Sequence, residues 1–416
     1  MSFAILGVGT AHPPDSLSAA DGLGVARVLA GPDVRTSTWL GPVYSNSGVD
    51  RRFQVLGGPL VRDLLGGTRD SGSPFLPTAA NEGVGPTTGQ RMEIYAREAG
   101  PLAVRASHAA LAEAGLEPGA ITHVVTVSCT GFAAPGADFA LITGLGLRPT
   151  VARTHVGFMG CHGALNGLRV ANAFATADPA ARVLLCAVEL SSLHYYYGSA
   201  ADKLIANAIF ADGAAAVVGR GQPLPPSPSP EKGGGGADSD VPQSETSARR
   251  LQPRTAPGPL LQAPPPPFSG EGDGGRGSWA LAASGSCLIP NSAADMGWTV
   301  GDHGFEMTLS RRVPGLIAGH LRPWLEAWLA DNGLSLAEVR SWAVHPGGPK
   351  IVSAVEECLG LSAEALAPSR AVFAGHGNMS SPTVLFIVQK LRAVDAPRPC
   401  VALGCGPGLV AEAALF

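Results

Sequence analysis

Runs of apolar, often β-branched residues recur along the chain and predict strands that are buried on both faces. These runs cover 122–129, 183–188 and 214–218, and, after a long interval, 341–345 and 400–404. Residues 1–15 contain a brief apolar run before Pro13, which is typical of a strand followed by a turn. They lack the positively charged start of a signal peptide, so we do not expect one here.

Apolar positions at helical spacing fill the intervals between the predicted strands. They predict five helices, over about 89–114, 162–177, 313–332, 350–359 and 381–394. We expect Pro101 to interrupt the first of them, because proline removes a backbone hydrogen bond inside a helix. Strands that alternate with helices in both parts of the chain indicate an α/β fold whose sheets are covered by helices.

One segment departs from both patterns. Residues 221–278 contain 13 Pro, 11 Gly and 7 Ser, including the runs PPSPSP, GGGG and PPPP. Such a composition cannot bury enough apolar surface to offset the entropy of ordering the chain. We therefore expect a disordered insertion at 221–278 between an N-terminal half, 1–220, and a C-terminal half, 279–416. A structured catalytic lid is the alternative.

Composition and charge exclude several classes of function. With 29 Lys and Arg against 33 Asp and Glu among 416 residues, the chain has a formal charge of −4 and no basic stripe for nucleic acid or anionic lipid. No stretch approaches the roughly 18 apolar residues of a membrane-spanning helix. The seven cysteines form no CxxC pair, which favours a reducing cytoplasm over a disulfide framework or a zinc site. We expect a cytoplasmic protein that holds no metal.

The segment 156–170 carries the strongest candidate for a nucleophile. It predicts an apolar strand ending at Gly160, a sharp turn at Cys161 and a helix that begins directly afterwards. A thiol at a helix N-terminus lies beside free backbone N–H groups that favour the nucleophilic thiolate. A buried structural cysteine is the alternative, because free cysteines are among the most buried residues.

Two further polar residues lie in loops of the C-terminal half. His345 ends a predicted strand and precedes Pro-Gly-Gly-Pro, so it can donate to an oxyanion, pair with a thiolate or simply occupy a turn. Asn378 precedes a helix that Ser380 and Ser381 can cap. Its carboxamide can donate to a carbonyl oxygen, or serve only the turn.

The wording of the motifs adds a resemblance to these indications. The chain contains, in this order, ILGVGTAHP, SGVDRRF, PGAD, GLRP, MGCHGALNGLR, FADGAAAVV, VPGLI, HPGGP, GNMSS and GCGPGL. In these motifs it resembles type III polyketide synthases, the chalcone and stilbene synthase family. The resemblance implies a thiolase-like layered αβαβα fold made of two similar halves, a homodimer, and chemistry without a metal or an organic cofactor.

For the site, the resemblance implies roles for three residues. Cys161 is expected to hold the growing acyl chain as a thioester, and His345 with Asn378 to stabilise the thioester carbonyl and the enolate. The substrates are then an acyl-CoA starter and malonyl-CoA, joined by repeated decarboxylative Claisen condensations. Phe210, in FADGAAA, matches the aromatic gatekeeper between the CoA tunnel and the cavity. A core phenylalanine at a strand end is the alternative.

Departures from the plant pattern bear on the expected substrate. The loop from Cys129 to Pro135 is two residues shorter than in plant members, and Ala134 replaces a methionine that enters the neighbouring subunit's cavity. Four further positions of the plant cavity also differ, namely Ser191, His194, Met307 and Cys405. We expect a roomier pocket without the plant aromatics, as in bacterial members that use fatty acyl starters and make alkylpyrones or alkylresorcinols.

The remaining candidates are contacts to substrate and CoA. Ser380, next to the proposed donor amide, is a candidate for substrate binding. Arg51, Arg52 and Lys350 are candidates for CoA phosphates, or else ordinary surface cations. Two rival functions stay open: a carrier-protein-dependent ketosynthase III-like enzyme, and a Cys-His thioesterase or protease. HPGGP favours the synthase, because it fits a histidine fixed as a donor rather than a mobile base.

Overall fold

The computed structural model describes residues 2–31, 34–79, 81, 83–222 and 279–416. The expected insertion at 221–278 lies outside the described residues except for its first two. These two residues end a strand, β7, that the sequence analysis stopped at Val218.

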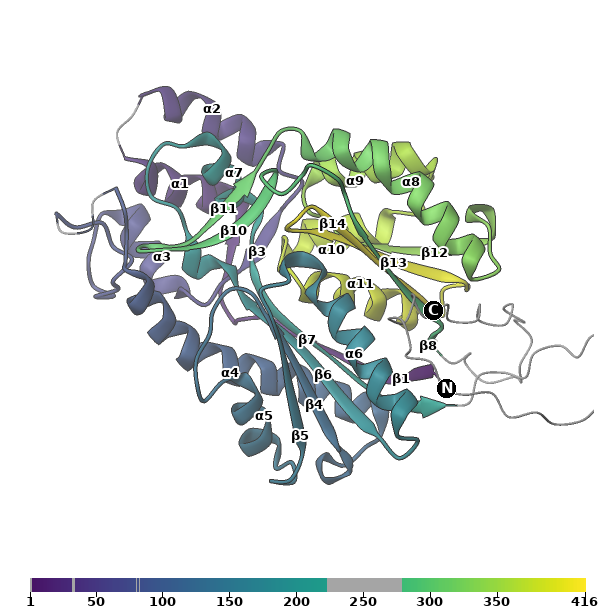
Figure 1. The fold of residues 1–416 in the computed structure, drawn as a ribbon. Helices are drawn as coiled ribbons and strands as arrows, with labels where there is room; N and C mark the ends of the chain where they lie inside the picture. The colour runs from purple at the N-terminus through teal and green to yellow at the C-terminus, as the bar shows by residue number, and fades with distance from the viewer. Residues whose placement is uncertain (1, 32–33, 80, 82, 223–278) are drawn as a thin grey trace, which may run out of the picture.

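A six-stranded mixed sheet forms the core of the N-terminal half (Figure 1). Its order is β5 (Ala152–Gly157), β4 (His123–Ser128), β6 (Arg182–Leu190), β7 (Asp212–Gln222), β1 (Ser2–Ala11) and β8 (Trp279–Leu281). β4 runs parallel to β5 and β6, whereas the pairs β6–β7, β7–β1 and β1–β8 are antiparallel. Because β8 follows residue 278, both parts of the chain contribute to this sheet.

A four-stranded sheet forms the core of the C-terminal half. Its order is β12 (Ser341–Val344), β13 (Cys400–Gly406), β14 (Val410–Leu415) and β9 (Ala283–Leu288). The first pair is parallel and the next two are antiparallel. From β4 through β6 and β7 to β1, the larger sheet has the same succession of pairs, which confirms the expectation of two similar halves.

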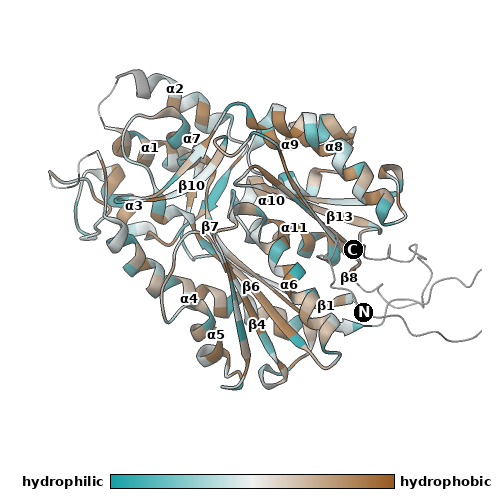
Figure 2. Cartoon of the chain, in the orientation of Figure 1, coloured by the Kyte–Doolittle hydropathy of each residue, from teal (hydrophilic) through white to brown (hydrophobic). Residues whose placement is uncertain are grey.

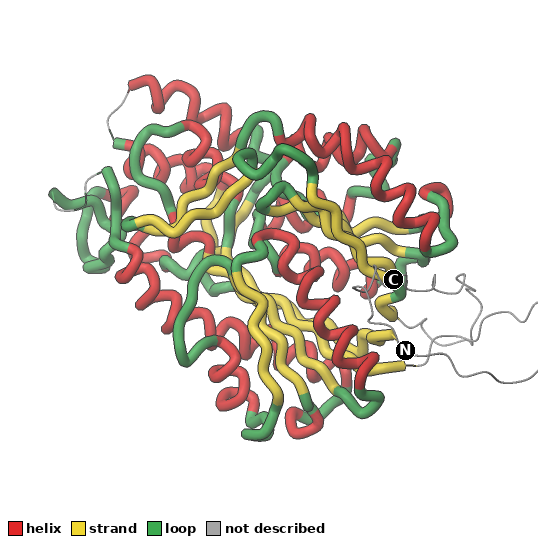
Figure 3. The backbone as a smooth tube through the Cα atoms, viewed as in Figure 1, coloured by secondary structure: helices red, strands yellow, loops and turns green. Residues whose placement is uncertain are grey.

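Five layers stack in the order helix, sheet, helix, sheet, helix (Figures 1 and 3). The central layer is α6 (Gly163–Ala177) and α11 (Pro382–Ala393), whose buried residues share one apolar core with strands of both sheets. The outer layers are α4 (Thr88–Ala114) and α5 (Ala137–Leu145) on the larger sheet, and α8 (Val313–Asp331) and α9 (Pro349–Leu359) on the smaller one. The expected αβαβα architecture is therefore confirmed.

Strand β6 shows why the buried strands read as continuous apolar runs. Its side chains alternate between the central core, with Val183, Leu185 and Ala187, and the core under α4, with Leu184, Cys186 and Val188. A strand that is covered on both faces has no polar face with which to alternate. Figure 2 accordingly shows much of this sheet in the hydrophobic colour.

Two predicted boundaries are wrong. α4 runs unbroken through Pro101, because this proline lies on the exposed side while the helix packs along β1, β6 and β7. A capping box of Thr87 and Gln90 starts the same helix. The strand before Cys161 ends at Gly157, three residues earlier than expected.

The other described α-helices and two two-stranded sheets surround these layers. They are α1 (Ala19–Ala30), α2 (Val34–Ser45), α3 (Gly57–Gly66), α7 (Ala201–Ile209), α10 (Ala367–His376), the pair β2 (Ser16–Ser18) and β3 (Arg51–Phe53), and the pair β10 (Met296–Gly301) and β11 (Gly304–Leu309). α1, α2 and α7 share an apolar cluster of their own. Across the described ranges, no helix combines the length and the hydropathy that a membrane span requires.

Candidate active site

Cys161 lies where the two halves meet, in the short 3₁₀ helix η2 (Gly160–His162) that leads into α6. Gly160 has a φ of 74°, and a Cβ there would lie 2.3 Å from Cδ of Pro407. A glycine is therefore required both by the backbone conformation and by the loop of the C-terminal half that packs against it. This contact holds the thiol-bearing turn of the N-terminal half next to β13.

Asn378 is held beside Cys161 by its backbone and by its side chain. Its N–H donates to the carbonyl of Ile209 (2.8 Å), and its carbonyl accepts from the N–H of Ala211 (2.9 Å). The side-chain Oδ1 accepts from the N–H of Ser380 (2.7 Å), which turns Nδ2 toward Cys161, 4.0 Å from Sγ. The carboxamide therefore presents an N–H to any oxygen carried on the carbon bonded to this sulfur.

Ser380 has a φ of 58°, a left-handed conformation that is uncommon outside glycine and often found at functional sites. Its hydroxyl lies 3.4 Å from Sγ of Cys129, and Ser380 also acts to lower the pKa of the Cys161 thiol. The predicted capping of the following helix is wrong, because Ser381 donates to Glu189 instead (2.6 Å) and α11 has no side-chain cap. Both serines belong to the surroundings of the thiol.

His345 directly follows β12, and its backbone N–H donates to the carbonyl of Leu403 on β13 (2.7 Å). The side chain is buried, and neither ring nitrogen has a hydrogen-bond partner among the described residues. Burial, together with the charge of His162, lowers the pKa of His345 to about 3, so the ring is neutral near pH 7. A neutral imidazole has one N–H to donate and one bare nitrogen to accept, and both are unused here.

Burial has the opposite consequence for the thiol of Cys161. It raises the pKa of this thiol to about 11, although hydrogen bonds with Ser380 and Asn378 act against the shift. In the free site, burial therefore acts on the thiol more strongly than the hydrogen bonds that favour the thiolate. The thiol loses its proton only when a neighbouring group accepts it.

A buried carboxyl group near the thiols was missed in the sequence analysis. Glu189, near the end of β6, accepts from the N–H of Cys129 (2.9 Å) and from the hydroxyl groups of Thr130 (2.7 Å) and Ser381 (2.6 Å). Burial raises its pKa. The run AVELSS gives no sign of these partners, because they come from other elements of the chain.

A cavity of about 250 Å³ is lined by four of the predicted pocket residues, Ser191, His194, Phe210 and Met307. The lining also has an aromatic wall made of Tyr195, Tyr196, Tyr197, Trp298 and Phe305. Met307 lines the cavity where plant members are expected to have a phenylalanine, but these other rings still give the cavity an aromatic wall. The three tyrosines follow the 3₁₀ helix η3 (Ser191–His194), and the other two residues come from the β10–β11 hairpin.

His194 lines this cavity but has no free nitrogen. Its Nδ1 accepts from the N–H of Phe305 (2.9 Å), and its Nε2 donates to the carbonyl of Thr130 (2.6 Å). The ring stacks on Phe305 with centroids 4.3 Å apart, and burial lowers the pKa of His194 to about 3. Any substrate contact of His194 is therefore limited to its carbon atoms. The hydroxyl of Ser191, by contrast, is buried without a partner among the described residues.

A second hollow, of about 560 Å³, opens beside the loop that follows His345. Gly347, Gly348 and Lys350 line it together with apolar side chains of α2 and α7. At the end of α7, Ile209 lines this hollow while the next residue, Phe210, lines the inner cavity. The predicted gatekeeper thus lies between two hollows.

The three cations predicted for CoA have different surroundings. Arg52 is buried, and its guanidinium donates to the carbonyls of Asn207 and Phe210. It braces the segment that carries Phe210 and is not available to a phosphate, which corrects its assignment. Arg51 is exposed on β3, and Lys350 is exposed at the rim of the second hollow.

Two positions taken as pocket substitutions lie outside both hollows. Cys405, on β13, packs in the core under α8 and α9 and is absent from the described linings. Ala134 is exposed in the loop 130–135, close to the exposed Phe132. Neither residue forms a cavity wall within the described part of the single chain.

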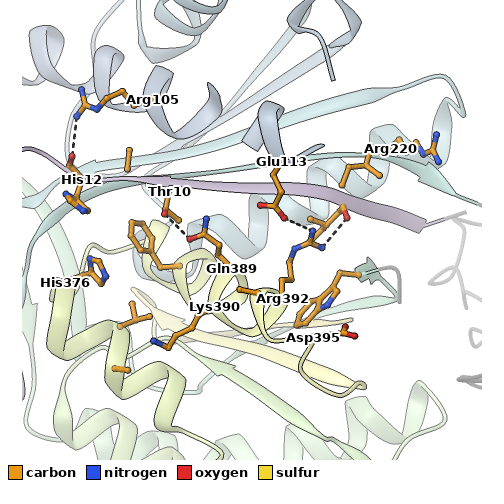
Figure 4. Close-up of a pocket in the computed structure, with 18 of the residues that line it drawn as sticks. Thr10, His12, Arg105, Glu113, Arg220, His376, Gln389, Lys390, Arg392 and Asp395 are labelled. Carbon is orange, nitrogen blue, oxygen red and sulfur yellow. Dashed lines mark hydrogen bonds and ion pairs between the residues drawn. The ribbon is translucent and has the colours of Figure 1, made fainter. Parts of the chain in front are cut away.

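A larger cavity, of about 1290 Å³, lies apart from all these residues (Figure 4). It is lined by parts of β1, α4, α10 and α11, and within it Arg392 donates to the carbonyl of Ile5 (3.2 Å) and to Glu113 (3.1 Å). Among its described lining residues there is no predicted site residue, so size alone does not identify the reactive site. The described ranges also contain no group of three His, Cys, Asp or Glu side chains arranged to hold a metal.

Comparisons with known sequences agree with this geometry. Residues 76–223 match the family of chalcone and stilbene synthases, N-terminal domain, and residues 280–416 match its C-terminal domain. An alpha-pyrone synthesis polyketide synthase-like protein of Mycobacterium tuberculosis is 31% identical over 334 residues, 79% of this chain and 73% of the relative. The 1,3,6,8-tetrahydroxynaphthalene synthase of Streptomyces peucetius is 32% identical over 321 residues, 76% of this chain and 72% of the relative.

Solved structures extend the comparison to three dimensions. PKS-I of the brown alga Ectocarpus siliculosus has a TM-score of 0.80 and 28% identity, covering 100% of this chain and 97% of the alga's. The C-terminal type III polyketide synthase domain of the Dictyostelium hybrid Steely1 has a TM-score of 0.77 over 100% of this chain and 99% of that domain. At 22% identity, the second likeness shows the fold alone. Three of these four relatives are named as polyketide synthases.

Proposed function

This chain belongs to the chalcone and stilbene synthase family and is a type III polyketide synthase, an acyltransferase, and we propose that Cys161, His345 and Asn378 catalyse its condensations. The observation that supports these roles most is the turned carboxamide of Asn378, whose Nδ2 lies 4.0 Å from Sγ of Cys161. A donor placed in this way is already aimed at an oxyanion that forms next to the sulfur.

Loading begins when Sγ of Cys161 attacks the carbonyl carbon of an acyl-CoA starter. The thiol proton passes to the bare nitrogen of the neutral His345. The bond between the carbonyl carbon and the CoA sulfur breaks, and the leaving thiolate takes up that proton. The products are an acyl thioester on Cys161 and free CoA.

Extension uses malonyl-CoA at the same site. Loss of carbon dioxide leaves the enolate of acetyl-CoA, whose oxygen accepts hydrogen bonds from His345 and from Nδ2 of Asn378. The enolate carbon attacks the thioester carbonyl, a carbon–carbon bond forms, and Cys161 leaves as a thiolate. Both substrates enter as CoA thioesters, so the proposed reaction has no step that needs a metal or an organic cofactor.

The starter is proposed to be a fatty acyl-CoA, giving alkylpyrone or alkylresorcinol-type products. The cavity behind Phe210 is lined by Met307 and aromatic rings as well as by polar groups such as Lys203 and Glu306, so part of its wall can take a flexible apolar chain. Each buried methylene contributes about 0.8 kcal/mol. The resemblance to a protein named for alpha-pyrone synthesis also supports this class of product.

CoA is proposed to lie in the second hollow. Gly347 and Gly348 line it next to His345, and Ile209 separates it from the inner cavity at the gatekeeper Phe210. This route brings the thioester end of CoA to His345 and leaves the phosphates near the rim. Lys350 and Arg311 line the same hollow and supply positive charge there, and Arg51 is a further exposed cation.

Two copies of the chain are proposed to associate along β5, at the edge of the larger sheet. The aromatic side chains of Phe132, Phe139 and Phe158, which lie on segments next to β4 and β5, are 54%, 49% and 46% exposed. An unpaired sheet edge beside exposed aromatic rings is typical of a protein interface. Sedimentation of Phe158→Glu against the parent chain measures whether this edge supports a dimer.

The catalytic assignment is tested by separating loading from decarboxylation. Cys161→Ala should abolish labelling of the protein by a radioactive acyl-CoA starter, because no other residue is proposed to form the thioester. Asn378→Ala should retain some labelling and lose most malonyl-CoA decarboxylation, by roughly 10²- to 10³-fold for one oxyanion donor. A Cys161→Ala protein that is still labelled would refute the assignment.

The starter assignment is tested with a panel of acyl-CoA substrates and malonyl-CoA, with mass spectrometry of the products. The kcat/KM values should rise with chain length over the medium to long range and exceed the value for coumaroyl-CoA. If coumaroyl-CoA or benzoyl-CoA surpasses every long acyl-CoA, the fatty acyl proposal is wrong.

A further inference from the structure

Arg52, on β3, takes no part in the steps above, yet only 3% of it is exposed. Its guanidinium donates to the carbonyls of Asn207 and Phe210, to the second over 3.3 Å. Asn207 lies in the last turn of α7, where carbonyls run out of helical N–H partners. The N–H that would continue the helix to this carbonyl, that of Ala211, donates to Asn378 instead. Arg52 therefore caps the end of α7 with a positive charge.

The segment that Arg52 caps is also the segment that holds Asn378. A short parallel bridge joins Phe210 to Asn378. Its two hydrogen bonds, 2.8 and 2.9 Å long, fix the N–H and the carbonyl of Asn378. The stem of Arg52 packs on the same place, because a Cβ on Gly377 would lie 3.1 Å from its Cγ. One side chain thus contacts both segments of the bridge.

Two aromatic rings and a carboxyl group hold the guanidinium in this position. Its central carbon lies 5.6 Å from the ring centroid of Tyr44 and 5.9 Å from that of Tyr195, within the range of cation–π attraction. Burial acts to lower the pKa of Arg52, but the two tyrosines and Asp212 raise it above its ordinary value. Arg52 therefore stays charged, and the carbonyls that it contacts accept charge-assisted hydrogen bonds.

We propose that Arg52 is a positioning residue, which sets the place of the Asn378 carboxamide by holding the end of α7. The proposal rests on the proposed role of Asn378 as an oxyanion donor. Arg52 is not among the described residues that line either hollow, so it acts through the backbone of 207–210 and not on a substrate. Without it, the end of α7 shifts and Nδ2 of Asn378 leaves its place 4.0 Å from Sγ of Cys161. A misplacement of about 1 Å can lower a rate by about 10²-fold.

The decarboxylation of malonyl-CoA by the full-length protein tests this proposal, because it depends on the donor amide and needs no starter. Arg52→Met keeps an apolar stem against Gly377 but loses the charge and the donors. Its kcat for release of labelled carbon dioxide should fall by about tenfold or more, while KM changes by less than about twofold. Arg52→Lys keeps a charge and a donor and should recover part of the loss. Arg27→Met, at an exposed site of the neighbouring α1, is the matched control and should behave as the parent.

A double-mutant cycle with Asn378→Ala separates positioning from a merely structural role. That background has no carboxamide to position, so adding Arg52→Met should lower the residual rate per folded molecule by less than about twofold. An equal loss in both backgrounds would overturn the proposal, and so would an unchanged kcat in Arg52→Met or a lysine variant no better than the methionine variant. If Arg52→Met does not fold, the same cycle with Arg52→Lys decides alone. Failure of the proposed function looks different, because Asn378→Ala by itself would then keep the parent rate.

Discussion

His345 and His194 lie in two different regions of the molecule, the loop after β12 and the wall of the inner cavity, and both are buried with a pKa lowered to about 3. Their hydrogen bonds differ. His194 uses both nitrogens on backbone groups, the N–H of Phe305 and the carbonyl of Thr130, whereas His345 uses neither on any described residue. One ring holds the cavity wall together, and the other has both nitrogens without a partner among the described residues.

Burial and pKa are alike for the two histidines, so their hydrogen-bond partners are what distinguish a wall residue such as His194 from a proposed catalytic residue such as His345. An unpaired buried polar group lowers the free energy of unfolding by about 1–3 kcal/mol. Both nitrogens of His345 are unpaired among the described residues, so a hydrogen bond from a substrate would remove this cost. His194 carries no such penalty. Leucine has a volume similar to that of histidine and no polar atoms. Substituting it for each ring should lower turnover in one variant and the free energy of unfolding in the other.

His345→Leu should have the largest effect, and it should fall on the chemistry. The variant loses one oxyanion donor, worth roughly 10²- to 10³-fold in rate, together with the proposed proton acceptor. Its urea midpoint should stay close to that of the parent, because an apolar side chain in this place leaves no group unpaired. Turnover of acyl-CoA and malonyl-CoA measures the first, and equilibrium unfolding the second. A variant that keeps more than about a tenth of the parent turnover contradicts the assignment.

His194→Leu should show the reverse. The carbonyl of Thr130 and the N–H of Phe305 lose their partners inside the protein, at about 1–3 kcal/mol for each unpaired group. Turnover per folded molecule should change only a few-fold, because no nitrogen of His194 is free for a substrate. Urea unfolding and active-site titration separate the two quantities. A stable but inactive variant would show that His194 takes part in the chemistry.

Acid should destabilise the protein through both rings. Their pKa values are about 3 in the folded chain, against an ordinary 6.5. The stability that each neutral ring contributes is thus present above about pH 6.5 and lost as the pH falls toward 3, with a slope of about 1.4 kcal/mol per pH unit for each ring. Unfolding free energies between about pH 4 and pH 7 measure this slope, and each leucine variant should lower it by one ring's share. A flat parent curve contradicts both pKa values.

Met307→Phe should have the smallest effect, because it changes only the wall of the inner cavity and not the proposed catalytic residues. Its ring fills part of the inner cavity, so preference should shift toward shorter acyl-CoA starters, by about fourfold for each methylene that no longer fits. The decarboxylation of malonyl-CoA should be unchanged. Val300→Phe, exposed on the same hairpin, is the matched control. A chain-length profile equal to that of the parent would show that Met307 does not bound the acyl chain.

Several parts of the fold were predictable because they depend on neighbours along the chain. The run 183–188 predicted a buried strand, since both faces of β6 are covered. The segment around Cys161 predicted a strand, a turn and a helix in the observed order, with only the end of the strand misplaced. Pro101 misled the analysis because its exposed position, which spares the helix, is a property of packing.

Tertiary contacts decided what adjacent residues do. Arg51 and Arg52 look equivalent in the sequence, yet the pairing of β3 with β2 exposes the first and buries the second. Arg52 then donates to carbonyls of a segment 155 and 158 residues away. No local pattern contains such a partner, which is why the same sequence motif suggested two phosphate ligands where the structure leaves one.

The sequence by itself determined the order of strands and helices and singled out Cys161, His345 and Asn378, because residue type, spacing and motif wording are properties of the chain. Only the tertiary structure decided that neither ring nitrogen of His345 has a hydrogen-bond partner among the described residues, whereas both ring nitrogens of His194 have one. The physical reason is that a buried polar group is defined by its partners. For His194, one of those partners lies 111 residues away in the chain and another lies 64 residues away.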